Sequence, residues 1–107
     1  MKTKSSTKAF ERPQPRKLVV LRLYIAGSSA RSTRAIQNAK EICETHLAGS
    51  YELEVIDIFK QPKLAKDDQI LAVPTLIKKL PAPLRRFIGD LSDRDVVLVG
   101  LDLKPKR

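Results

Sequence analysis

The chain contains one cysteine, Cys43, and this residue limits the thiol chemistry that the protein can perform. A thiol–disulfide enzyme needs one thiolate to attack and a second thiol nearby to resolve the mixed disulfide. Cys43 has no partner, and it stands at helical spacing among apolar residues, where a cysteine behaves as a small hydrophobic side chain. The sequence therefore predicts a buried structural cysteine, no internal disulfide and no thiol oxidoreductase activity, which fits a reducing cytosol.

The other chemistry-bearing side chains form no catalytic or metal-binding pattern. His46 is the one histidine, and no other ligand type stands at metal-binding spacing from it. Acidic residues gather at 67–68 and 90–95, but both groups are mixed with lysine or arginine and lack the spacing of a calcium loop. We expect helix caps and solvated faces at these positions, and therefore no enzyme, no metal site and no cofactor.

Lys78, Lys79, Arg85 and Arg86 form the densest cluster of positive charge between the two termini. Arginine side chains can bind the carboxylates of a partner through paired hydrogen bonds. An ordinary solvated basic surface would have the same composition. The residues themselves leave these two interpretations open.

The net charge of +9 is concentrated at the ends of the chain. Residues 1–17 contain six basic groups and one acidic group, which gives +5, and residues 104–107 contain three basic groups, which gives +3. The remaining 12 basic and 11 acidic groups sum to +1. The pattern predicts a disordered basic tail over residues 1–16, one domain over residues 17–103 and a second basic tail over residues 104–107.

This distribution of charge bears on nucleic-acid and membrane partners. A nucleic-acid-binding domain concentrates its charge on a structured face, whereas here the charge lies in the tails, so we expect no specific nucleic-acid partner. Basic tails still attract polyanions in a salt-dependent way, and a nucleic-acid-associated protein stays an alternative. The chain has no run of about 18 apolar residues, which argues against a transmembrane helix. We therefore expect a cytoplasmic protein.

The N-terminal half of the predicted domain alternates strand, helix and strand. Residues 17–26 carry apolar side chains on both faces, which is typical of an inner strand. Ser32 is placed to cap a helix that continues to about Leu47. Residues 51–58 form a second strand with Val55 on its inward face. A crossover of this length predicts two parallel strands in a right-handed unit.

A second helix begins near Pro62, which stands early in its first turn. Helical spacing places four residues near one another on its inner side, Leu64, Ala65, Asp68 and Leu71, and leaves Lys66 and Asp67 more exposed. Residues 70–103 then give conflicting signals. Ser92, with an acidic residue three positions later, indicates a helix start, but the Val-Val-Leu-Val run at 96–99 prefers a strand. Residues 84–88 fit a short strand or a helix, so this half is compatible with two folds.

With these segments in view, the chain resembles the KaiB family of circadian-clock proteins. The matching segments occur in order, and they are residues 21–27, 55–58, 62–65, 72–76, 85–86, 88–92 and 99–103. The resemblance implies an α/β fold with a thioredoxin-like N-terminal βαβ half and a metamorphic C-terminal half. One form would self-associate as a dimer or tetramer, and the other would be a partner-binding monomer. Thioredoxin-like enzymes carry a cysteine pair at the turn that reads Ser-Ser-Ala-Arg at 28–31 here.

The resemblance also implies partners. A family member binds the N-terminal ring of a KaiC-like hexameric ATPase, and it then sequesters KaiA or displaces a KaiB-like sensor histidine kinase. The second helix is the implied docking element. The implied partner-binding residues are Lys63, Leu64, Ala65, Asp67 and Asp68, supported by Arg34, Arg85 and Arg86.

Three further positions are implied to govern the switch between folds. Pro74, in a Val-Pro-Thr step where thioredoxin-like folds place a cis proline, is the implied hinge. Gly100 and Asp102 match the Gly-Leu-Asp-Leu end that would set the balance between the two forms. Glycine is compatible with either form, whereas alanine at position 100 would favour the helical ending. We therefore expect Gly100→Ala to raise the fraction of monomer.

Some residues depart from the family pattern. The chain ends in a basic segment and has a basic N-terminal extension, its second predicted strand carries Glu52 and Glu54, and Gln69 replaces a lysine that is usual in the family. These departures indicate a divergent paralogue that acts in a stress response or a simpler KaiB–KaiC timer. A thioredoxin-like redox protein is a second alternative, beside the nucleic-acid-associated protein.

Overall fold

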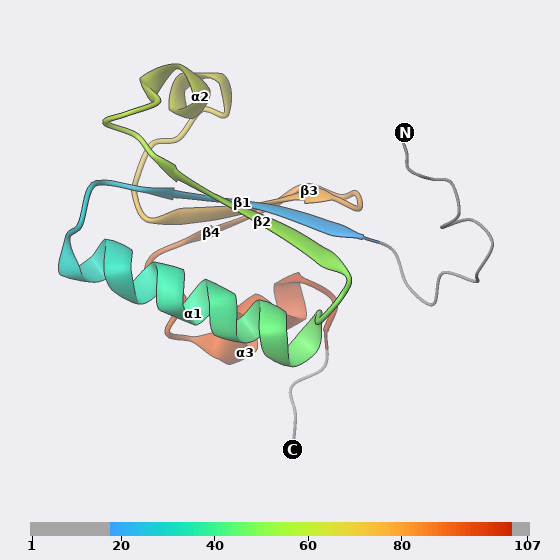
Figure 1. The fold of residues 1–107 in the computed structure, drawn as a ribbon. Coiled ribbons are helices and arrows are strands. Elements are labelled where there is room, and N and C mark those ends of the chain that lie inside the picture. Colours follow the sequence, from blue (N-terminus) through green and yellow to red (C-terminus); the bar gives the residue numbers. More distant parts are fainter. Residues whose placement is uncertain (1–17, 104–107) are drawn as a thin grey trace.

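The computed structural model describes residues 18–103, which form a four-stranded mixed sheet with helices on both of its faces (Figure 1). β1 (Val19–Ile25) pairs in parallel with β2 (Tyr51–Asp57) and antiparallel with β3 (Thr75–Leu80). β3 pairs in turn with β4 (Arg85–Ile88), also antiparallel, so the strand order is β2-β1-β3-β4. The inner position of β1 confirms the prediction from its two apolar faces.

The two predicted basic tails, over residues 1–16 and 104–107, lie outside the described residues, and so does Lys17 at the start of the predicted first strand. Within the part that the structure describes, every helix is too short or too polar to span a lipid bilayer.

Helix α1 (Ala30–His46) connects the two parallel strands and begins earlier than predicted. Ser29, and not Ser32, is its N-cap: the Ser29 Oγ atom accepts a hydrogen bond from the backbone N–H of Ser32 at 3.1 Å. Ser32 is buried, and its Oγ atom accepts a hydrogen bond from the N–H of Ala26 at 3.1 Å. The prediction was wrong because both serines fit the capping pattern, and the contact with the end of β1 distinguishes them.

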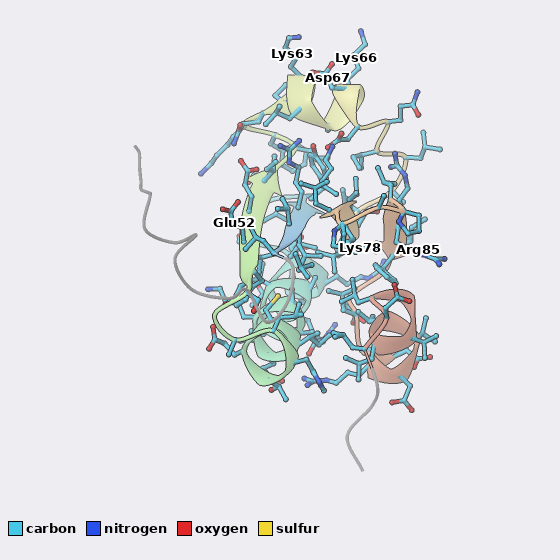
Figure 2. The ribbon with its side chains drawn as sticks, turned by 90° about the vertical axis from the view of Figure 1, so that its right-hand side faces the viewer. Glu52, Lys63, Lys66, Asp67, Lys78 and Arg85 are labelled. Carbon is cyan, nitrogen blue, oxygen red and sulfur yellow. The ribbon has the colours of Figure 1, made fainter. Side chains whose placement is uncertain are left out.

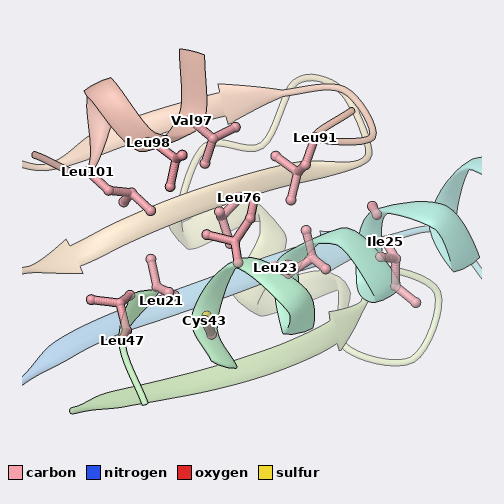
Figure 3. Close-up of a cluster of buried hydrophobic side chains, with 13 residues drawn as sticks. Leu21, Leu23, Ile25, Cys43, Leu47, Leu76, Leu91, Val97, Leu98 and Leu101 are labelled. Carbon is pink, nitrogen blue, oxygen red and sulfur yellow. The ribbon is translucent and has the colours of Figure 1, made fainter. Parts of the chain in front are cut away.

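α1 and α3 (Arg94–Gly100) cover one face of the sheet and enclose the main core (Figures 1 and 3). The buried side chains of the main core are Leu21, Leu23, Ile25, Ala35, Ala39, Ile42, Cys43, Leu47, Leu76, Leu91, Val97, Leu98 and Leu101. Burying one large aliphatic side chain contributes about 1.5–3 kcal/mol, so this face supplies most of the hydrophobic stabilisation. The position of Cys43 confirms the predicted buried cysteine.

α2 (Pro62–Asp67) lies on the opposite face of the sheet (Figure 1). The buried side chains beneath it form a smaller core of Tyr24, Ile56 and Ile77. Leu64 and Ala65 are partly buried against this smaller core, as predicted. Val55 was predicted to face inward, but it is 37% exposed, because β2 is an edge strand.

Leu71 departs from the predicted inner side of the second helix, because its side chain is 96% exposed. α2 ends at Asp67, and Gln69 then adopts a left-handed φ of 56° that turns the chain before Leu71. The Ile70 N–H donates back to the carbonyl of Ala65 at 2.9 Å, which is the closing bond of a Schellman motif. Helical spacing therefore does not predict which side chains are buried after the end of α2 at Asp67.

The sequence signals for strand and helix conflicted in the C-terminal half. In the structure, residues 85–88 form the short strand β4 and residues 94–100 form the helix α3. Asp93, and not Ser92, caps α3 by accepting a hydrogen bond from the N–H of Val96 at 3.5 Å. The β-branched run is helical here because Val97 and Leu98 are buried in the main core. Tertiary burial thus outweighs the local preference for a strand.

Candidate functional site

Helix α2 presents a charged outer side (Figure 2). Lys63, Lys66 and Asp67 project from it into solvent, and the Lys63 Nζ atom lies 3.8 Å from the Asp67 carboxylate. Leu64 and Ala65 turn toward the smaller core. Of the residues that the family resemblance assigned to docking on this helix, Lys63 and Asp67 are therefore the accessible ones. Lys66 was expected to be exposed but was not assigned a role.

Asp68 ties the end of α2 to the sheet. Its Oδ1 atom accepts a hydrogen bond from the Nζ atom of Lys79 at 2.6 Å. Its Oδ2 atom accepts hydrogen bonds from Arg22 Nη1 at 3.0 Å and from the Tyr24 hydroxyl at 2.5 Å. The Asp68 side chain is only 12% exposed. This geometry gives Asp68 a positioning role, because it joins α2 to β1 and β3 and has little surface left for a partner.

The hydrogen bonds around Asp68 also fix its charge. Burial would raise the pKa of Asp68, but the bonds that it accepts, above all from Lys79, outweigh burial and lower this pKa to about 2. For the phenol, burial and the bond to Asp68 raise the pKa of Tyr24 to about 12. The carboxylate is therefore ionised and the phenol neutral near pH 7, as this set of hydrogen bonds requires.

The basic cluster expected from four neighbouring lysines and arginines does not form one surface. Lys78 is 2% exposed, in the middle of β3. Lys79 is bound to the carboxylate of Asp68. Neither lysine presents a free ammonium group to a partner, so the pair fits neither a partner-binding surface nor an ordinary solvated one.

The two arginines of β4 point to opposite faces of the sheet. Arg86 stands opposite Ile77, which belongs to the smaller core, so Arg86 lies on the α2 face. Arg85 stands opposite Lys78, whose β1 neighbour Leu21 belongs to the main core, so Arg85 lies on the α1 face. Adjacent residues in a strand alternate between faces, and adjacency in the sequence was therefore a poor guide to a shared surface.

Arg34 does not join a cluster on the α2 face either. Its Nε atom donates to the Oδ2 atom of Asp90 at 2.9 Å, and the Asn38 Nδ2 atom donates to the Asp90 carbonyl at 2.8 Å. Arg94 at the start of α3 also forms an ion pair with Glu41 of α1. These contacts join α1 to the segment that leads into α3. Asn38 and Glu41 could not be predicted from local sequence patterns, because their partners lie more than 50 positions away.

The turn before α1 lacks the groups that a thioredoxin-like enzyme uses. Residues 27–32 contain no cysteine, and burial raises the pKa of the Cys43 thiol to about 12. A thiol with this pKa is almost entirely protonated at neutral pH and is a poor nucleophile. Within the described residues, no group of three His, Cys, Asp or Glu side chains could hold a metal ion.

The positions implied to govern a fold switch have defined local conformations. Within the described residues, the cis peptide bonds are Val73–Pro74, Leu80–Pro81 and Ala82–Pro83. Asp102 follows α3 with a left-handed φ of 63°. Beyond it the Leu103 N–H donates to the carbonyl of Leu98 at 2.7 Å, so α3 ends in a Schellman motif. Asp102 therefore sets the point at which the chain leaves the helix.

Gly100 lies in the last turn of α3, against the ring of Phe87 in β4. A Cβ atom built on Gly100 would lie 2.3 Å from the Cε1 atom of Phe87, far inside van der Waals contact. The missing side chain therefore makes room for the ring. That alanine at position 100 favours the helical ending stays a prediction, and this contact between a strand and a helix acts against it.

These features define a class: a thioredoxin-like domain without a thiol pair, in which a short helix displays charged side chains. The family model described as "KaiB domain" matches residues 22–103. The chain is 57% identical over 89 residues to the circadian clock oscillator protein KaiB of Synechococcus sp. (strain RCC307), covering 83% of this chain and 81% of that protein. The chain belongs to the KaiB family, which confirms the family prediction.

Further comparisons agree with this assignment. KaiB of Prochlorococcus marinus subsp. pastoris is 58% identical over 88 residues, or 82% of each chain. The N-terminal domain of Synechococcus elongatus SasA has a TM-score of 0.66 and 24% identity, over 97% of this chain and 99% of that one. Chloroplastic thioredoxin z has a TM-score of 0.66 and 17% identity, over 81% and 79% of the two chains. At these identities the two structures show a shared fold alone, and they confirm the thioredoxin-like α/β class.

Proposed function

We propose that the protein is a non-enzymatic regulator that binds a KaiC-like hexameric ATPase and modulates its phosphorylation and output, in a circadian clock or a related timer. The observation that carries the proposal is the placement of α2, whose charged outer side stands on a base held by Asp68. Lys63 and Asp67 contact the ATPase, while Leu64, Ala65 and Asp68 position the helix. The names of the relatives, circadian clock oscillator proteins, support this role.

The arginines divide between two surfaces. Arg86 lies on the α2 face and extends the docking surface. Arg34 and Arg85 belong to the α1 face. We therefore assign Arg34 and Arg85 to contacts within or between subunits, and not to ATPase docking.

The proposal includes a second, resting form in which the C-terminal half is folded differently and the chain self-associates as a dimer or tetramer. The thioredoxin-like monomer is then the form that binds. Apparent affinity falls in proportion to the population of this form, and slow exchange between the two forms delays binding. Pro74, Gly100 and Asp102 balance the two folds. Bound to the ATPase, the monomer sequesters KaiA or displaces a KaiB-like sensor histidine kinase, which fits the fold shared with the SasA N-terminal domain.

Equilibrium binding to the isolated N-terminal ring of the KaiC-like ATPase of the same cell tests the docking role of α2. The full chain is compared with the double variant Lys63→Glu/Lys66→Glu, which reverses the charge of the outer side. We expect the Kd of this variant to rise at least about tenfold, because like charges placed across an interface oppose binding. Lys40→Glu, on the exposed side of α1, is the matched control and should bind like the wild type.

Two results would contradict the proposal. If the wild-type chain does not bind the ring, the proposed partner is wrong. If the wild type binds and the double variant binds equally well, the ATPase uses another surface. Circular dichroism of each variant checks that the fold is intact.

A further inference from the structure

The sheet is open beside α2. Helix α2 has six residues and leaves the β4 side of its face uncovered. There a groove of about 230 Å³ runs between β4 and the segment that follows α2. The groove is lined by Gln69, Ile70, Leu71, Ala72, Thr75, Arg86 and Ile88. It is continuous with the proposed docking helix, because its first lining residue stands two positions after the end of α2.

Two large aliphatic side chains flank this groove and face solvent. Leu71 is 96% exposed and Ile88 is 72% exposed. They come from different elements, the segment after α2 and β4, so no local feature of the sequence explains their proximity. A single exposed leucine is ordinary, but two exposed aliphatic residues on one groove are typical of an interaction site.

The groove also carries a positive charge. Among the described residues that line it, Arg86 is the one charged side chain, and no described carboxylate forms an ion pair with it. Asp68, the partly buried acid on this face, is bound to Lys79 and Arg22. Asp90, which lines a neighbouring pocket together with Arg86, is bound to Arg34. Arg86 is therefore available to bind a carboxylate from outside the chain through paired hydrogen bonds.

Building on the proposed docking role of α2, we propose that this groove receives a segment of the partner protein in which an aliphatic side chain stands next to a carboxylate. The aliphatic side chain packs between Leu71 and Ile88, and the carboxylate binds Arg86. Nucleic acid fits the groove poorly, because its described lining has one cation and no aromatic ring for base stacking. An acidic peptide segment of the ATPase ring satisfies both the apolar walls and the charge.

Binding to the N-terminal ring of the KaiC-like ATPase, with the full-length chain, tests this inference. Leu71→Ser and Ile88→Ser remove the apolar walls, and each should raise the Kd about tenfold. Leu71→Met keeps an apolar side chain and should bind nearly as well as the wild type. Val99→Ser is the matched control, because Val99 is 65% exposed on α3, outside the groove.

The ionic contact has its own measurement. Arg86→Gln should weaken binding about tenfold at low salt. Because it removes one screened charge pair, the affinity of this variant should also fall less steeply with salt than that of the wild type. Lys40→Gln, a charge removed from the opposite face, should leave both the affinity and its salt dependence unchanged.

The outcomes separate the groove from the proposed function. If the groove variants bind normally while Lys63→Glu/Lys66→Glu fails, the groove proposal is wrong and the function of α2 stands. If the wild type does not bind the ring, both are wrong. Should Leu71→Ser and Arg86→Gln instead abolish binding to phosphatidylserine vesicles or to duplex DNA, with binding to the ring unchanged, the groove serves another class of partner and the inference is overturned.

Discussion

The two faces of the sheet use their side chains differently. On one face, α1 and α3 enclose thirteen buried residues among those described. On the other, α2 covers three. The first face is closed by apolar packing, whereas α2 is held over the second by the hydrogen bonds of Asp68. Leu71 and Ile88 stay exposed beside it.

With the docking role proposed for α2, this difference would let a small domain fold with one face and bind a partner with the other. Hydrophobic burial scales with area, so a face that buries many side chains stabilises the domain and has little surface left for a partner. A polar network can fix one short helix in place without covering the strands beside it. The α2 face therefore combines a defined geometry with an open apolar and cationic surface, and we expect it to be the less stable part of the domain.

Truncating a buried leucine on the first face and a partly buried leucine on the second tests this contrast most strongly. Leu23 is 0% exposed in the main core, and Leu23→Ala should lower the free energy of unfolding by about 3 kcal/mol, because the cavity cannot fully collapse. Leu64 is partly buried under α2, and Leu64→Ala should cost about 1 kcal/mol. Urea unfolding followed by circular dichroism measures both values.

If Leu64→Ala costs as much as Leu23→Ala, the two faces contribute equally to stability, and the division between a folding face and a binding face is wrong. Binding to the ATPase ring should show the reverse order, with Leu64→Ala the more damaging variant at temperatures where both are folded.

Removing the charge of Asp68 tests how α2 is held. Asp68→Asn leaves Arg22 and Lys79 without a buried anion, and we expect a loss of about 2 kcal/mol in the free energy of unfolding at pH 7. The matched control is Asp67→Asn, whose carboxylate is exposed and lies 3.8 Å from Lys63. An exposed pair of this kind contributes about 0–1 kcal/mol. Equal effects of the two substitutions would argue against the positioning role of Asp68.

The contribution of Asp68 should depend on pH in a predictable direction. Its pKa in the folded protein is about 2, below the ordinary value of 3.8. A lowered pKa stabilises the fold above pH 3.8, and this stabilisation is lost as the pH falls toward 2. The difference in stability between the wild type and Asp68→Asn should therefore be constant near neutrality and shrink between these two values. A constant difference down to pH 2 would assign the effect to packing.

Local periodicity predicted the closed face better than the open one. The inner strand β1 and the buried Cys43 follow from the spacing of apolar residues, which a helix or strand imposes over a few positions. The limits of prediction appear where distant residues meet. Helical spacing placed Asp68 on the inner side of the second helix, but it could not identify its partners Arg22 and Lys79, which stand 46 and 11 positions away.

The C-terminal half was the least predictable part for a related reason. Its strand and helix signals are of similar strength in the sequence, and the burial of Val97 and Leu98 decides between them in the folded domain. Leu71 was misplaced because a left-handed Gln69 ends the helical period. Arg85 was grouped with Arg86 because they are adjacent in the sequence, but adjacent residues of a strand lie on opposite faces of the sheet.

The smallest expected effect concerns the contact between Gly100 and Phe87 on the closed face. In the wild-type background, Gly100→Ala gains about 1 kcal/mol of helix propensity. It loses about 1–3 kcal/mol by overpacking, because its Cβ atom would lie 2.3 Å from the ring of Phe87. We expect a net loss of about 1 kcal/mol. In a Phe87→Leu background the ring is gone, and the same substitution should be neutral or stabilising.

A double-mutant cycle over these two positions measures the coupling directly. The readouts are urea unfolding and the monomer fraction by sedimentation. If the closed face is packed as tightly as the buried residues indicate, Gly100→Ala raises the monomer fraction with Phe87→Leu and lowers it without. If alanine raises that fraction equally in both backgrounds, the ring can move aside at no cost. Side chains on the closed face would then be loosely packed at the α3 end. The two faces would differ only in how tightly their side chains pack.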